Sequence, residues 1–242
     1  MTYIGKHTNN MLCQETKMAH TDDIAHRLAE LLKPVLPGFQ YVKSRAEFRK
    51  NCENVADVVG IDVNTRGGES YSIAFHVGVV HSAVELLIAE VEGRKASPYD
   101  KTIYQYSPNV GKQDVLPFGG AVWWWGLPQH TDFSNIENEL RGFLTGFALP
   151  YCERFHDVMT VRKSLETRDG LSLNMLPFKQ VLSIDTVFDD REHVESYLAL
   201  LQREIDSGYH HDLAQFNSFY ASLRSRFGRL FPDFELTPKV KA

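Results

Sequence analysis

Apolar and polar residues alternate in two neighbouring stretches of the chain, residues 55–63 and 71–79. Alternation over this length is typical of β-strands that bury one face. The link between the two stretches carries Gly67 and Gly68, which accept the positive φ angles of a hairpin turn. The pattern therefore predicts an antiparallel hairpin. Its predicted buried residues are Val59, Ile61, Ile73, Phe75 and Val77.

Helical spacing of apolar residues marks segments on both sides of this hairpin. One helix is predicted over residues 21–36, just before a Pro-Gly pair that ends it. The charge-rich residues 39–51 are predicted to form a single solvated edge strand. A further helix is predicted over residues 82–92, packed against the sheet, because Ser82 and Glu85 have capping-box spacing at its start.

The second half of the chain is predicted to be mainly helical. Residues 94–120 form a long connection, and connections of this length are usually functional or mobile. The short apolar run 121–125 that follows it could be a fourth strand. Helical patterns then cover residues 134–165 (with Pro150 expected to kink or restart the helix), 178–187, 189–207 and 213–227.

Strands followed by a run of helices predict an α+β fold. The expected architecture is an N-terminal helix, an antiparallel sheet of three to four strands with a packed helix, and a helical C-terminal half. Residues 1–20 are expected to be a flexible arm, residues 21–170 an α+β domain, and residues 171–242 a helical extension packed on that domain.

Composition narrows the classes of function. The net charge of −5 argues against a general nucleic-acid binder, which is usually basic. Three cysteines without a spacing pattern do not predict a disulfide framework or a closed zinc site. The first twenty residues are polar and no apolar stretch approaches the roughly 20 residues that span a bilayer. We therefore expect a soluble, cytoplasmic protein with no membrane partner.

Several short sequence features resemble an uncharacterised bacterial family, the domain of unknown function numbered 4304. The resemblance covers roughly residues 22–160. It is carried by Gly38-Phe39, Phe48-Arg49, the run Tyr71-Ser-Ile-Ala-Phe-His-Val-Gly78, the tryptophans, and Leu149-Pro-Tyr-Cys-Glu-Arg-Phe155. These features are typical of a fold and not of a catalytic signature, so the resemblance implies no activity.

Ten histidines raise the question of a metal site. The densest cluster is His210-His211-Asp212, but adjacent residues on a helix point about 100° apart and cannot easily chelate one ion. The sequence has neither a His-Glu-x-x-His nor a Cys-x-x-Cys pattern. We therefore expect neither a metal nor a cofactor.

His76 lies on the small-residue face of the predicted hairpin, where space is left for a covering helix or a ligand. If Val63 lies opposite Tyr71, Asp62 faces Ser72, four residues from His76, which is roughly 13 Å at about 3.3 Å per residue. An Asp62–His76 hydrogen bond is therefore not expected. The candidate polar groups of an active site are His76, Asp62, Arg45, Glu47 and His130.

Three consecutive tryptophans, Trp123, Trp124 and Trp125, follow the long connection. On a strand they cannot all face one side, so at least one is expected near the surface, where aromatic residues are enriched at interfaces. All three could instead fill the junction between sheet and helices.

Two functions from different classes remain open. The first is a non-catalytic protein-interaction protein, of the immunity or adaptor type, which binds a protein partner through residues 94–120 and the tryptophans. The second is an enzyme that acts on a small polar molecule in a cleft between the hairpin and the helical half. The identity of a partner or substrate and the oligomeric state do not follow from the sequence.

Overall fold

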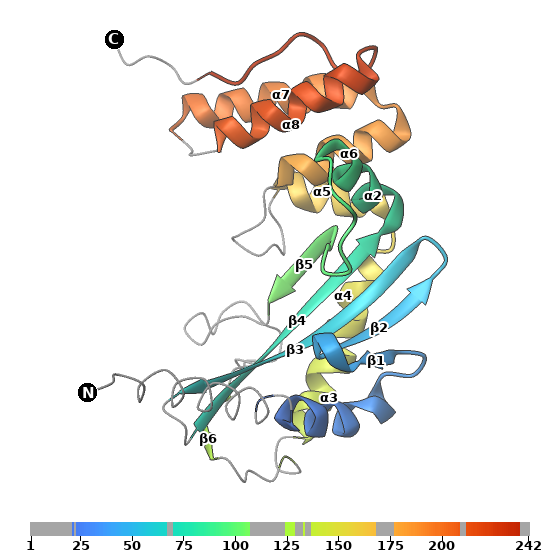
Figure 1. Ribbon diagram of the computed structural model, residues 1–242, viewed down its shortest axis with the longest axis vertical. Helices are drawn as coiled ribbons and strands as arrows, with labels where there is room; N and C mark the ends of the chain where they lie inside the picture. Colours follow the sequence, from blue (N-terminus) through green and yellow to red (C-terminus); the bar gives the residue numbers. More distant parts are fainter. Residues whose placement is uncertain are drawn as a thin grey trace, which may run out of the picture. The chain divides into compact units, whose positions relative to one another are not determined.

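The computed structural model describes residues 21, 23–66, 70–106, 124–128, 133, 137–167, 177–208 and 212–237. They form the predicted α+β fold, which is drawn in Figure 1. The chain divides into two compact units. We call residues 1–79 with 104–155 the sheet unit, and residues 80–103 with 156–242 the helical unit. The predicted domain boundary near residue 170 divides the chain differently, because it assigns residues 80–103 and 156–170 to the sheet.

The sheet has six strands among the described residues, more than the three to four predicted. Five of them follow the order β1-β2-β3-β4-β5, and β6 pairs with β4. The pairs β1–β2, β2–β3 and β4–β6 are antiparallel. The strands are β1 (Gln40–Val42), β2 (Glu47–Cys52), β3 (Val55–Arg66), β4 (Ser70–His81), β5 (Ile103–Tyr106) and β6 (Trp124–Pro128).

The prediction of a single edge strand over residues 39–51 is wrong, because this segment is a hairpin of β1 and β2. A 3-10 turn (Lys43–Arg45) and Ala46, whose φ is +47°, connect the two strands. The N–H of Ile61 donates to the carbonyl oxygen of Ala46 at 2.8 Å, which fixes this turn against β3. The charged residues of β2 consequently lie inside the sheet, and Glu47 is only 1% exposed.

The hairpin of β3 and β4 confirms the firmest prediction from the sequence. Its five predicted core residues are all buried. The opposite face is buried as well, since Ala56, Val58 and Ala74 are at most 4% exposed. The residues with small side chains on that face therefore lie beneath other parts of the protein.

Helices complete the core of the sheet unit. Residues 23–32 are helical and bury Ile24, Leu28 and Leu32, as predicted. The helices α3 (Glu137–Phe143) and α4 (Leu149–Arg154) are joined by a π-helical turn (Leu144–Ala148). This turn ends two residues before Pro150, which lacks an N–H, and the chain stays helical through the proline. The rings of Phe143 on α3 and Phe75 on β4 lie 5.6 Å apart.

The helical unit contains α2 (Ser82–Val91), α5 (Val158–Thr167), α6 (Pro177–Phe188), α7 (Arg191–Asp206) and α8 (Leu213–Phe227). Helix α6 lies at its centre and contacts α2, α5, α7 and α8. The last two helices have the predicted positions, and the Asp190 carboxylate caps α7 by accepting from the N–H of His193. Helix α2 exists as predicted but belongs to this unit.

The start of α2 differs from the predicted capping box. His81 occupies the N-cap position, and its N–H donates to the hydroxyl of the buried Thr102 at 2.8 Å. The Thr102 hydroxyl also hydrogen-bonds the carboxylate of Glu85. Burial, opposed by that hydrogen bond, raises the pKa of Glu85 to about 7. With His81 at the N-cap, Glu85 is the fourth helical residue and not the third, so it interacts with Thr102 and does not complete a capping box.

Within the described residues, no helix is both long and apolar enough to cross a membrane.

Candidate functional site

Charged side chains gather around Gly60 on one face of the sheet. Gly60 on β3 pairs with Glu47 on β2. The ring of His76 on β4 lies over Gly60, because a Cβ atom at this glycine would meet His76 Cε1 and Nε2 at 2.0 Å. Only glycine leaves room for the ring there. We call Arg45, Glu47, Arg49, Asp62 and His76 the Gly60 cluster.

The structure overturns the expectation that Asp62 and His76 lie too far apart. Nδ1 of His76 is 3.1 Å from Oδ2 of Asp62. The strands β3 and β4 reach further into the link than predicted, to Arg66 and from Ser70. If Arg66 lies opposite Ser70, then His76 lies opposite Gly60, which agrees with the position of its ring. Asp62 is then two residues along β3 from the position opposite His76. Long side chains bridge such diagonal pairs, so the discarded pair forms.

Arg45 and Glu47 form an ion pair in the same cluster. Nη1 of Arg45 lies 3.0 Å from Oε1 of Glu47, and the two side chains are 15% and 2% exposed. The contact lacks the alignment of a hydrogen bond, and within the described residues Glu47 Oε1 accepts none. The 3-10 turn and the left-handed Ala46 place the two residues side by side at the start of β2.

Arg49 was not among the candidate residues from the sequence, because it was one of several charged residues on a predicted edge strand. It faces the same side of β2 as Glu47, two residues further along. Its Nε donates to Oδ1 of Asn51 at 3.2 Å. Its Nη1 is buried and has no hydrogen-bond partner among the described residues. The alternation of β2 could have identified it, once β2 is recognised as an interior strand.

The remaining sequence candidates lie outside what the structure describes. This holds for His130 and Trp123 entirely. Trp124 and Trp125 belong to β6, where Trp124 pairs with Ile73, but the described structure does not extend to their side chains. The adjacent His210 and His211 are outside it as well. Of the five candidate polar groups, the structure therefore brings four together.

A second histidine–aspartate pair, which the sequence did not reveal, lies in the helical unit. Nδ1 of His193 on α7 is 2.9 Å from the Asp185 carboxylate on α6, and Nε2 is 2.8 Å from Oε1 of Glu166 on α5. Nη1 of Arg162 contacts Asp185 and Asp190 at 2.8 Å each. Asp185, an acidic residue in a mostly apolar stretch of α6, was the signal that could have found it, and the structure buries it completely.

This second pair is charged and fully engaged. The hydrogen bond to Asp185, and next the ion pair with Glu166, raise the pKa of His193 to about 9. The side chain is consequently an imidazolium at neutral pH, with a carboxylate on each nitrogen. Such a group links three helices and has no nitrogen left for a substrate, so we interpret it as structural.

Two further features of the described residues bear on the chemistry: the buried Cys152 and the spacing of the possible metal ligands. Cys152 is buried on α4, and burial, the largest cause, raises the pKa of its thiol, which keeps it protonated. Among these residues no three or more His, Cys, Asp or Glu side chains are grouped so that they could hold a metal ion.

Comparison with known proteins gives no relative: no family model, no curated protein and no solved structure matches this chain. The function has to be argued from the Gly60 cluster itself.

Proposed function

We propose that the protein is an enzyme that acts on a small polar molecule at the Gly60 cluster, with His76 as its general acid–base. The observation that carries this proposal is the 3.1 Å contact between His76 and Asp62. The two side chains are 14% and 40% exposed, so this pair is neither deeply buried nor fully solvated.

The chemistry follows from the hydrogen-bonding capacity of the two groups. An ionised carboxylate only accepts hydrogen bonds, so Asp62 holds the imidazole proton on Nδ1 and leaves a lone pair on Nε2. That nitrogen lies over Gly60, toward the centre of the cluster. His76 would take a proton there and return it, while Asp62 positions the ring and stabilises the imidazolium that forms.

Arg49 and Glu47 would hold the substrate. Arginine pairs with carboxylates and phosphates through several N–H groups, and Nη1 of Arg49 has a buried donor to offer. Glu47 Oε1 offers a buried acceptor on the same strand face. A small molecule with an acidic group and a nearby N–H or O–H donor matches both.

The test is a turnover screen of the purified full chain against carboxylic acids, amino acids and phosphate esters, followed by proton NMR at pH 7.5. We expect one class to be converted. His76→Gln should lower kcat/KM for it by about 100-fold or more, the usual contribution of general acid–base catalysis. Asp62→Asn should lower it less, because the base is still present.

His193→Gln is the matched control, since it removes a histidine that also contacts an aspartate but lies in the helical unit. It should leave kcat/KM within about threefold of the wild type at a temperature where both proteins are folded. Equal turnover by His76→Gln and wild type would refute the proposal. So would a screen in which no compound is converted and none raises the melting temperature.

The interaction-protein hypothesis stays a prediction. It rests on residues 94–120 and Trp123, Trp124 and Trp125, whose side chains the structure does not describe beyond residue 104. A cytoplasmic location likewise stays a prediction.

A further inference from the structure

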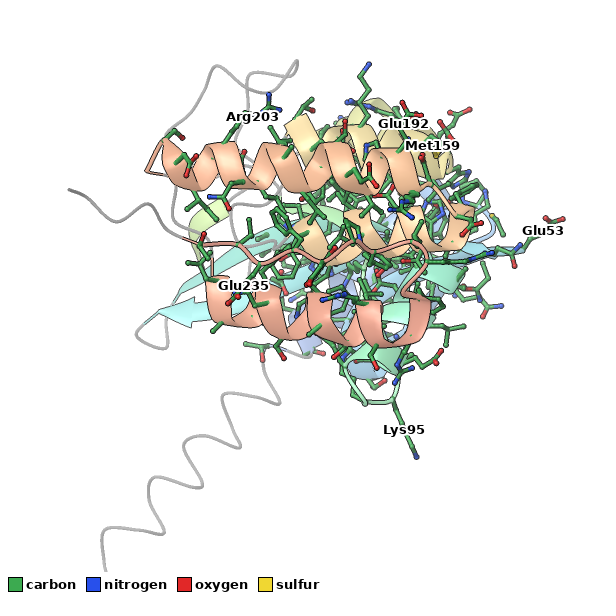
Figure 2. All side chains as sticks on the ribbon, turned by 90° about the horizontal axis from the view of Figure 1, so that it is seen from above. Glu53, Lys95, Met159, Glu192, Arg203 and Glu235 are labelled. Atoms are coloured by element: carbon green, nitrogen blue, oxygen red, sulfur yellow. The ribbon has the colours of Figure 1, made fainter. Side chains whose placement is uncertain are left out.

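The segment after α8, residues 230–237, is extended and lies along the helical unit. Figure 2 looks onto it from above: the segment, labelled at Glu235, runs between α7, which carries Glu192 and Arg203, and α8. Helices α7 and α8 each pack on α6. The segment therefore occupies a groove that has α7 and α8 as its two walls.

Two carboxamide side chains hold the backbone of this segment. Asn217 on α8 donates to the carbonyl oxygen of Leu236 at 3.4 Å and accepts from its N–H at 3.3 Å. Gln202 on α7 donates to the carbonyl oxygen of Thr237 at 2.9 Å, and the N–H of Thr237 lies 3.5 Å from its oxygen. Each carboxamide thus engages both backbone groups of one residue, as a neighbouring β-strand would.

Side chains of the segment fill the groove at two places. Phe231 and Leu236 are almost completely buried, and the ring of Phe231 packs edge-on against Tyr220 of α8 at 5.5 Å. The Tyr220 hydroxyl donates to the carbonyl oxygen of Pro232 at 2.8 Å. Between the two anchors, the exposed Asp233 pairs with Arg224 at the groove edge.

These contacts are the elements of peptide recognition. Main-chain hydrogen bonds give affinity that is independent of sequence, and side-chain sites five positions apart give specificity. Apart from the turn in which the carbonyl oxygen of Phe227 accepts from the N–H of Leu230, the hydrogen bonds from α7 and α8 to the segment come from side chains in the described residues. A different peptide with the same spacing would satisfy the same groups.

We propose that the groove between α7 and α8 binds an extended peptide of a partner protein, and that residues 230–237 occupy it as an internal competitor. The partner peptide carries an aromatic residue and, five positions later, a leucine, with an acidic residue between them that pairs with Arg224. Because the internal segment is tethered, its high effective concentration keeps the site closed to weak ligands.

The experiment uses a fluorescein-labelled peptide with the sequence of residues 229–237 and the full chain, read by fluorescence polarisation. The double variant Phe231→Ala, Leu236→Ala should release its internal segment. This variant should therefore bind the labelled peptide at least tenfold more tightly than the wild type. Adding Asn217→Leu and Gln202→Leu should remove that gain. A peptide with alanine at both anchor positions is the matched control and should not compete.

Hydrogen exchange on the wild type gives a second measurement that does not depend on the variants. Excess unlabelled peptide should speed exchange in residues 230–237 severalfold as it displaces them. Unchanged exchange, together with no binding to the released variant, would overturn the proposal. So would a concentration-dependent dimer that Leu236→Ala abolishes, because the occupant would then be a second copy of this chain.

Discussion

His76–Asp62 in the sheet unit and His193–Asp185 in the helical unit are the same chemical pair at nearly the same distance, 3.1 and 2.9 Å. Their surroundings differ. Asp62 is 40% exposed, whereas Asp185 is completely buried and has a second cation, Arg162. His193 has a carboxylate on both nitrogens, whereas Nε2 of His76 lies over Gly60. A histidine–aspartate contact therefore does not define a role; the second nitrogen and the burial of the carboxylate do.

The largest expected difference between the two pairs is in how much each contributes to stability. Asp185→Asn removes the shared carboxylate of a buried network and leaves Arg162 and His193 short of a counter-charge. We expect a loss of about 3–5 kcal/mol in the free energy of unfolding. Asp62→Asn, at a partly exposed pair, should cost below about 1 kcal/mol. Urea denaturation of both variants measures the difference, and equal losses would remove the distinction between the pairs.

The next effect concerns the space above Gly60. Gly60→Ala places a Cβ atom 2.0 Å from the His76 ring, so the ring has to leave its position beside Asp62. We expect a cost of about 1–3 kcal/mol, as for other overpacked sites. Gly142→Ala is the control, because nothing lies within 4 Å of a Cβ atom there. If Gly60→Ala is as stable as this control, the tight packing of His76 is refuted.

The smallest effect is a pH dependence of stability that arises from His193. The pKa of His193 is raised from 6.5 to about 9 in the folded protein. Protonation therefore favours the folded state, so this stabilisation is complete below pH 6.5 and is lost as the pH rises through 9. The melting temperature should fall more steeply between pH 7 and 10 for the wild type than for His193→Gln. Parallel curves would contradict the charged link between the helices.

Much of the fold could be predicted because local patterns determine it. Alternation over β3 and β4 identified their buried face, and helical spacing identified α7 and α8 with their ends. The hairpin of β1 and β2 was missed since its turn depends on a left-handed Ala46, a residue type that rarely adopts that conformation. Because this turn was not predicted, β2 was taken for an edge strand although it lies between β1 and β3. Arg49 was overlooked for the same reason.

Part of the candidate site could also be predicted. Arg45, Glu47, Asp62 and His76 were selected from the sequence as plausible polar groups. The pairing of Asp62 with His76 was rejected, because the assumed register placed Asp62 four residues from the position opposite His76, whereas the two side chains lie 3.1 Å apart. His193 and Asp185 were missed, since they lie on different helices and no local pattern connects them.

The sequence by itself determined most of the regular elements, among them β3, β4, α7 and α8, and the apolar faces of these elements, because both follow from residues that are close together in the chain. The tertiary structure decided which charges meet. It placed His76 over Gly60 beside Asp62, joined three helices at His193, and laid residues 230–237 between α7 and α8. These contacts connect residues far apart in the chain, and their geometry depends on strand register and helix packing, which small differences in loop length can change.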